Sequence, residues 1–195
     1  LFVPETTKDV ELGLKYAGDS LGLPITFNAD VFQQWVKNIQ RAAYILTPQG
    51  VSLLTANVPK AKISGAEFDL AVRPSEWVQF GLSGNYTRAR YTSDTINVLG
   101  NTLVYGPFAD VPKWSGTLFG EVGMPLAGDT GNLRLRADVY GQTKMPFSNT
   151  GATTSPATIL PGYVLVNGRL TWDEMLGSHL SSSLFVRNLF NRKYY

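Results

Sequence analysis

The sequence has no cysteine and only one histidine, His179, among its 195 residues. The absence of cysteine excludes disulfides, thiolate metal sites and cysteine nucleophiles, and a single histidine excludes a multi-histidine metal centre. An excess of one charge sign is also lacking, because 17 Lys and Arg stand against 15 Asp and Glu. The longest basic cluster is Arg192-Lys193, so nothing indicates a nucleic-acid surface. We therefore predict no metal site, no cofactor and no nucleic-acid partner.

Long apolar runs are missing as well. Stretches such as 42–46 and 163–166 fall far short of the roughly 20 residues that a membrane-spanning helix needs. Charged residues are also scarce, at 16% of the chain, whereas aromatic residues reach 12%. Ordinary soluble domains carry about 25% charged residues, so this composition suits apolar surroundings. The sequence thus predicts no transmembrane helix but an affinity for an apolar environment.

The sequence does contain apolar residues at alternate positions, the pattern of a strand with one apolar face. In the clearest case Leu133, Leu135 and Val139 alternate with Arg134 and Arg136. Each such segment covers about 10 residues, longer than most strands of soluble sheets and close to the length that crosses a bilayer at a tilt. The predicted strands are 7–17, 25–35, 63–73, 77–88, 114–124, 133–142, 163–172 and 180–189.

The connections between these strands alternate between short and long. The long ones are 36–62, 91–113 and 143–162, and those between them are short. Outer-membrane barrels have short turns on the periplasmic side and long loops outside, whereas soluble sandwiches have no reason to alternate in this way. The pattern favours a membrane barrel over a soluble sandwich and predicts that the long loops lie outside the cell.

Pairing across the short turns predicts the register of the strands. Around residues 74–76 the apolar faces match when Val72 lies opposite Val78 and Leu70 opposite Phe80. In the first hairpin the best apolar register instead sets Glu11 against Asp30, a like-charge contact that argues against that register.

The polar faces are predicted to line a watery interior, and Glu121 is expected opposite Arg136 there as an ion pair. These inward charges could form a ligand path or a docking surface, or could simply balance one another in pairs, which is the reading we prefer. They are Asp9, Glu11, Lys15, Glu67, Asp69, Glu121, Arg134, Arg136, Asp138, Arg169 and Arg187.

The opposite faces are predicted to contact lipid, with tryptophans near both membrane surfaces. Trp35 and Trp114 fall at the outer ends of their strands, and Trp77 and Trp172 at the periplasmic ends, as two aromatic belts require. Trp77, unlike the other three, is out of phase with the apolar face. Residues expected to face lipid are Leu12, Phe27, Leu70, Phe80, Leu135, Val166 and Val186.

Short motifs recur along nearly the whole chain in a consistent order. They are Pro4-Glu5 with residues 10–15, residues 28–32, Asn57-Val58, residues 64–68, Arg73-Pro74, residues 84–87, Val111-Pro112-Lys113-Trp114, Leu160-Pro161-Gly162-Tyr163 and residues 186–195. Together they resemble the carboxyl-terminal part of TonB-dependent outer-membrane receptors. The resemblance implies an all-β fold: an antiparallel transmembrane β-barrel, of which this chain supplies about eight strands of 22.

The Asn188-Leu189-Phe190 motif resembles that of the family's last strand but one, so counting back assigns residues 1–195 to strands 14 to 21. The plug domain, the TonB box and the closing strand are then absent from this sequence. We therefore expect an open, curved segment of a wider barrel, whose first and eighth strands do not pair with each other.

The resemblance implies a receptor in the outer membrane of a Gram-negative bacterium, in contact with outer-membrane lipid. Such receptors bind a scarce ligand, often a ferric siderophore, and import it with energy relayed by the TonB complex. The sequence does not name the ligand. Aromatic residues of the long loops are the candidates for binding it, since their rings offer large rigid surfaces. They are Tyr44, Tyr91, Tyr105, Phe108 and Phe147.

Two other classes stay open at this stage. Some small eight-stranded outer-membrane barrels are enzymes, but His179 is predicted in a periplasmic turn beside Ser178, and no catalytic residue is identified. A passive porin is opposed by the motif series alone. The aromatic candidates also have a simpler role, which is to pack the loops against one another.

Overall fold

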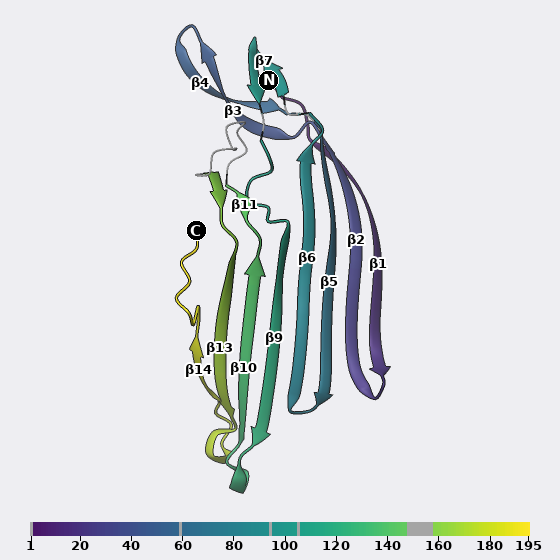
Figure 1. Cartoon of the computed structure of the whole chain (residues 1–195), viewed down its shortest axis with the longest axis vertical. Helices are drawn as coiled ribbons and strands as arrows, with labels where there is room; N and C mark the ends of the chain where they lie inside the picture. The colour runs from purple at the N-terminus through teal and green to yellow at the C-terminus, as the bar shows by residue number, and fades with distance from the viewer. Residues whose placement is uncertain (1, 59, 94, 105, 148–157) are drawn as a thin grey trace.

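The computed structural model describes residues 2–58, 60–93, 95–104, 106–147 and 158–195. In this part of the chain eight long strands form one antiparallel sheet, and they follow one another in chain order. Figure 1 shows them side by side in a single curved layer, with the long connections at one end and the short turns at the other. The strands are β1 (Thr6–Ser20), β2 (Leu23–Lys37), β5 (Ala61–Ser75), β6 (Val78–Tyr91), β9 (Trp114–Pro125), β10 (Asn132–Gln142), β13 (Tyr163–Asp173) and β14 (Ser182–Val186).

All eight predicted strands are present, and most of their bounds lie within three residues of the prediction. The strand that is shortened at both ends is β14, which covers Ser182–Val186 instead of 180–189. Within the described residues β1 pairs only with β2, and β14 only with β13, so they form the two edges of the sheet. The prediction that the first and eighth strands do not pair is confirmed.

The predicted faces are confirmed by the register. Leu82 of β6 pairs with Leu70 of β5 and with Leu118 of β9, which places apolar side chains in one row across neighbouring strands. This face is not covered by other parts of the described chain, since Leu12 is 74% exposed and Leu135 is 54% exposed. An apolar face of this extent is unfavourable in water but suits contact with lipid.

The register of the first hairpin differs from the best apolar match by two residues. Ser20 pairs with Leu23 across a two-residue turn in which Leu21 and Gly22 both have positive φ, at 54° and 77°. Such a turn matches the twist of the two strands. As a result Gly13, and not Glu11, lies opposite Asp30, and the like-charge contact is avoided.

The predicted register around residues 74–76 is also wrong by two residues. Val72 lies opposite Phe80, not Val78, because the register shifts between Val72 and Ser75. An irregularity here suits Pro74, which has no backbone N–H to donate to the ladder. Side chains alternate with period two, so an even shift keeps every residue on its predicted face.

The long connections contain strands that the alternation pattern did not predict. They form three small two-stranded sheets: β3 (Gln40–Thr47) with β4 (Gly50–Asn57), β7 (Thr95–Val98) with β8 (Asn101–Val104), and β11 (Met145–Pro146) with β12 (Ile159–Leu160). A buried cluster of Val36, Ile39, Val58 and Ala61 packs at the base of the first connection, and Ile96, Leu103 and Phe108 of the second pack against it. These two connections are therefore held in place by apolar packing as well as by backbone pairing.

Short 3₁₀ turns occur at the other end of the sheet, at Ala127–Asp129 and Met175–Gly177. The Leu176 N–H donates to the carbonyl of Thr130 at 3.0 Å and joins the two turns, and the indole Nε1 of Trp172 in β13 donates to the same carbonyl at 2.9 Å. No helix in the described residues is long and apolar enough to cross a membrane.

Candidate functional site

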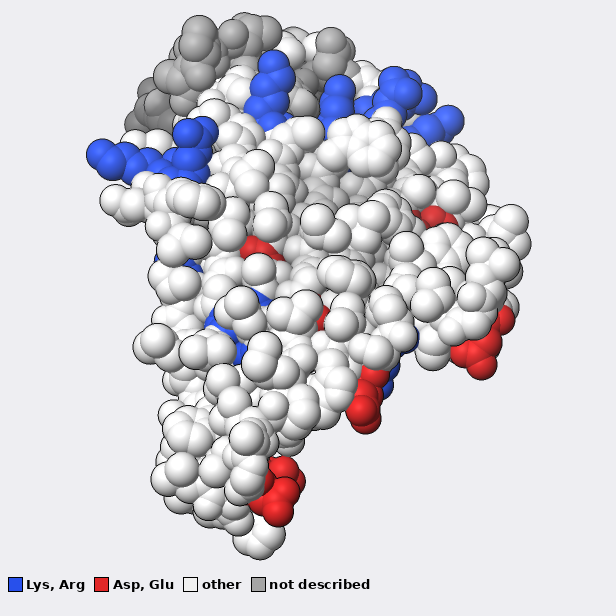
Figure 2. Space-filling model, turned by 60° about the horizontal axis from the view of Figure 1, so that its bottom comes forward, with Lys and Arg blue, Asp and Glu red and all other residues white. Residues whose placement is uncertain are grey.

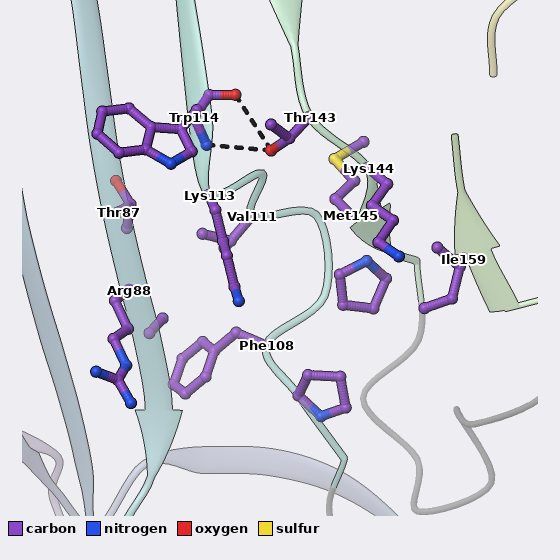
Figure 3. Close-up of a pocket in the computed structure, with 13 residues that line it drawn as sticks. Thr87, Arg88, Phe108, Val111, Lys113, Trp114, Thr143, Lys144, Met145 and Ile159 are labelled. Carbon is purple, nitrogen blue, oxygen red and sulfur yellow. Dashed lines mark hydrogen bonds between the residues drawn. The ribbon is translucent and has the colours of Figure 1, made fainter. Parts of the chain in front are cut away.

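A pocket of about 630 Å³ opens where the long connections leave the sheet. Its walls come from the end of β6, from residues 107–114 and from β11 and β12, as Figure 3 shows. Backbone hydrogen bonds hold these segments together: Thr143 N–H donates to the carbonyl of Trp114 at 2.9 Å, and Asp110 N–H donates to that of Pro146 at 2.8 Å. The Thr143 hydroxyl also accepts from the Trp114 N–H at 3.1 Å. The pocket is therefore built on paired backbone.

The pocket combines apolar walls with positive charge. Phe108, Val111 and Met145 contribute apolar surface, and Arg88, Lys113 and Lys144 contribute three cations. No Asp or Glu is among the described residues that line it. In Figure 3 Lys113 extends toward the Phe108 ring. An apolar cleft with a few charged groups of one sign suits an anion that also carries apolar or aromatic surface.

Of the five aromatic residues singled out from the sequence, Phe108 lines this pocket. Tyr91 stacks on Phe108, with ring centroids 4.5 Å apart and an interplanar angle of 23°. The Tyr91 hydroxyl also accepts from Arg41 Nε at 3.4 Å. Tyr91 and Phe108 pack against the buried cluster at the base of the loops, so the packing role considered above applies to both.

Tyr44 and Phe147 do not line this pocket. Tyr44 lies on β3 and is 70% exposed, and Phe147 follows β11 and is 48% exposed. Tyr105 lies outside the described residues. The structure thus brings two of the predicted residues together and leaves two others apart.

Sequence reasoning missed most of the residues around the pocket. Lys113 and Trp114 were noted only within a motif and as part of a membrane belt, and Lys144, Met145 and Ile159 were not considered. These residues come from connections that are far apart in the sequence, and no spacing signal relates them.

Within the described part of the chain, some of the predicted interior charges on the inner face of the sheet form ion pairs, and others do not. Glu121 lies opposite Arg136 as predicted, with 4.0 Å between carboxylate and guanidinium, but Arg136 is closer to Asp138, at 2.7 Å. Arg134 pairs with Asp173, to which its Nε donates at 2.8 Å. For Glu121, Arg134, Arg136 and Asp138 the charges are thus balanced in pairs, whereas Arg169 lies opposite Arg136, and neither Arg169 nor Arg187 forms an ion pair with a described residue.

The acidic side chains of the first strands are different. Asp9, Glu11, Asp30 and Glu67 line a second, smaller hollow of about 260 Å³, together with Phe32 and Gln34. Among the described residues none of these four carboxylates takes part in an ion pair. Across all the residues that the structure describes, no three Asp, Glu or His side chains lie close enough together to hold a metal ion.

Comparison with known proteins is consistent with this architecture. The chain aligns with the crystal structure of the ferric yersiniabactin uptake receptor FyuA from Yersinia pestis with a TM-score of 0.73 and 23% identity, over 99% of this chain and 26% of that one. It aligns with the copper transporter OprC with a TM-score of 0.74 and 17% identity, over 100% of this chain and 27% of that one. With the ferric-catecholate import receptor Fiu from E. coli K12 the TM-score is 0.68 and the identity 19%, over 99% of this chain and 24% of that one.

The chain spans about a quarter of the length of each of these receptors. At such low identity the similarity establishes the fold alone. A comparison with curated proteins finds no match.

A match to a protein-family model says more about this chain than the structural similarity does. The model described as "TonB dependent receptor-like, beta-barrel" matches residues 2–189. This family and the aligned structures are transport receptors rather than enzymes, so the enzyme alternative is set aside. Since the match covers nearly all of the sequence, the chain belongs to the TonB-dependent receptor family and forms part of the family's β-barrel.

Proposed function

We propose that this chain is part of an outer-membrane receptor that imports a scarce small ligand with energy relayed by TonB. Family membership supports a transport receptor. The exposed apolar face of the sheet supports a place in lipid, and the family supports the outer membrane of a Gram-negative bacterium. A plug domain, through which such receptors engage TonB, belongs to this proposal.

We further propose that the ligand is a ferric siderophore. The observation that carries this is the pocket described above, which Arg88, Lys113 and Lys144 line together with apolar residues that include Phe108. Ferric complexes of catecholate chelators combine negative charge with aromatic rings, and cations beside an aromatic side chain suit both features. Two of the aligned proteins are described as the ferric yersiniabactin uptake receptor FyuA and the ferric-catecholate import receptor Fiu.

The test is uptake of radioactive ferric catecholate by cells that express the full-length protein and lack their own siderophore receptors. We expect saturable uptake that disappears when TonB is deleted. A Lys113→Gln/Lys144→Gln variant should take up the complex several-fold less well, because each cation near an anionic ligand contributes on the order of 1 kcal/mol.

The matched control is Lys60→Gln/Lys193→Gln, which removes the same charge from exposed positions outside the pocket and should leave uptake unchanged. Equal loss in both variants would show that the pocket is not the binding site. Uptake that persists without TonB, with free diffusion of sugars in a liposome-swelling assay, would instead establish the passive porin.

A further inference from the structure

A row of cations crosses the apolar face of the sheet near the end that carries the long connections. Lys8 of β1 pairs with Trp35 of β2, Trp35 pairs with Lys62 of β5, and Lys62 pairs with Arg90 of β6. These four residues, which we call the basic row, are direct neighbours across four consecutive strands. Figure 2 shows Lys and Arg side chains gathered along one end of the molecule.

The basic row lies on the face that is predicted to contact lipid. Lys8 is in phase with Leu12, Lys62 with Leu70, and Arg90 with Leu82, since each pair is separated by an even number of residues along its strand. The interior charges therefore lie on the opposite face. Arg88, which lines the pocket, is two residues from Arg90 on β6 and shares the face of the basic row. If further strands extend the barrel, they pair with the edges β1 and β14 and leave this face uncovered.

The positive charge of the basic row is not compensated within the described chain. At the paired positions of β1, β2, β5 and β6 this face carries no Asp or Glu. Lys8, Lys62 and Arg90 form no ion pair with any described residue. Lys62 and Arg90 are directly opposite each other, an arrangement of like charges that destabilises a sheet unless an anion lies between them.

Toward the middle of the sheet the basic row is followed by apolar and aromatic side chains. The cations therefore lie near the edge of the lipid-contacting band. Two rows nearer the centre, Tyr86 pairs with Trp114, and their rings lie 4.6 Å apart. Aromatic side chains of this kind occupy the level of the lipid headgroups. Neighbouring residues on one face are separated by roughly 7 Å along the strand, so the basic row lies about 14 Å further along the strands.

We propose that the basic row binds the phosphate groups of phosphorylated lipids in the outer leaflet of the membrane. This inference rests on the proposed outer-membrane location but does not depend on the imported ligand. Lys8, Lys62 and Arg90 supply the charge, and Trp35 supplies an amphipathic ring between the first two. Each phosphate oxygen accepts hydrogen bonds from ammonium or guanidinium groups, and a phosphate between Lys62 and Arg90 removes their mutual repulsion.

The test uses the purified full-length protein in detergent, with bisphosphorylated lipid A as the probe and bound lipid counted by native mass spectrometry. A cation near an anionic lipid surface contributes about a fivefold effect on affinity, so the Lys8→Gln/Lys62→Gln/Arg90→Gln variant should bind roughly a hundredfold more weakly. The single Lys62→Gln variant should bind about fivefold more weakly, and it serves if the triple variant fails to fold.

Two controls separate charge on this face from charge in general. Lys15→Gln/Arg169→Gln/Arg187→Gln removes three cations from the inner face and should retain lipid A binding. Lys8→Arg/Lys62→Arg/Arg90→Lys keeps the charge in place and should also retain it. Weakening by the inner-face variant that equals that of the triple variant would overturn the proposal.

The source of the phosphate is tested with two further probes. Dephosphorylated lipid A should bind the unaltered protein about as weakly as lipid A binds the triple variant, and inorganic phosphate should not displace lipid A. Undiminished binding of dephosphorylated lipid, or displacement by inorganic phosphate at equal phosphate concentration, would overturn the proposal. The lipid-binding experiment does not involve iron uptake. A failure of ferric catecholate uptake would therefore contradict only the proposed function.

Discussion

The ring of Phe119 lies over Gly81, the residue directly opposite it on the neighbouring strand. A Cβ at position 81 would stand 2.6 Å from Cζ of that ring, so only glycine leaves the ring its place. On its other side Phe119 meets the guanidinium of Arg136, whose Cζ is 3.9 Å from the ring centroid. A glycine, an aromatic ring and a cation thus cover one another across three strands of the inner face.

We predict that Gly81→Val destabilises the folded barrel by about 1 to 3 kcal/mol, because Phe119 must leave its position to admit the new side chain. The control is Gly13→Ala, where the nearest atoms would be 3.7 Å from the added Cβ. Urea unfolding followed by tryptophan fluorescence measures both. A Gly81→Val variant as stable as the control would show that the ring is free to move.

The face assignment predicts opposite outcomes for two neighbouring residues. Leu82→Arg places a charge on the apolar face between Leu70 and Leu118, at a cost of roughly 2 to 4 kcal/mol if this level is near the bilayer centre. Ser83→Arg points into the interior beside Asp69 and should be tolerated. The amount of folded protein in the membrane, judged by its heat-dependent shift on gels, should fall only for Leu82→Arg. Equal amounts would contradict the face assignment.

The strands could be predicted because a lipid-facing sheet imposes a strict period of two, so every residue of a strand reports its face. The register could not be predicted as well. In the first hairpin it depends on the positive φ of Leu21 and Gly22, and near Pro74 on an irregularity, neither of which changes the polar and apolar alternation. The assignment of the eight strands to positions 14 to 21 of a 22-stranded barrel stays a prediction.

The site was less accessible to sequence reasoning than the fold. Aromatic residues could be located in the long connections, and Phe108 does line the pocket. Lys113 and Lys144 both line the pocket because their neighbours Trp114, the first residue of β9, and Thr143 are joined by a backbone hydrogen bond. Contacts between separate connections leave no periodic pattern, so no inspection of either segment alone would have paired them.

The partners of Arg136 are predicted to contribute unequally. Asp138 lies 2.7 Å from its guanidinium, whereas Glu121 lies 4.0 Å away. Because these side chains are partly exposed, we expect Glu121→Gln to change the free energy of unfolding by less than about 0.5 kcal/mol and Asp138→Asn by about 1 kcal/mol. Urea unfolding at low and high salt checks this, and the difference should shrink as salt screens the pair. A larger loss for Glu121→Gln would mean that the longer contact is the stronger one.

Asn101 is predicted to hold two of the outer hairpins together. Its side chain accepts a hydrogen bond from the Leu46 N–H at 3.3 Å and donates one to the Leu46 carbonyl at 3.2 Å, which links the β7–β8 turn to β3. Asn101→Ala should speed hydrogen exchange at the Leu46 amide about thirtyfold, because two hydrogen bonds are lost and each costs on the order of 1 kcal/mol, while the amides of β10 stay unaffected. The control is Thr102→Ala on the same strand. Unchanged exchange at Leu46 would show that the hairpins do not depend on this contact.

The last prediction concerns the orientation of the sheet in the membrane. Long connections and short turns lie at opposite ends of the strands (Figure 1), and the proposed outer-membrane location predicts that one set is outside the cell and the other in the periplasm. We expect a cysteine introduced at Gln49, in the exposed β3–β4 turn, to react with a membrane-impermeant maleimide on intact cells. Cysteines at Asp19 and Asp129, at the short-turn end, should react only after the outer membrane is permeabilised.

These 195 residues contain no cysteine, so within them each signal reports the introduced position. Labelling at Asp19 or Asp129 on intact cells, with protection at Gln49, would invert the orientation. It would also move the pocket and the basic row to the periplasmic side, where neither an external ligand nor outer-leaflet lipid reaches them. This one experiment therefore tests a premise that the proposed ligand site and the proposed lipid site share.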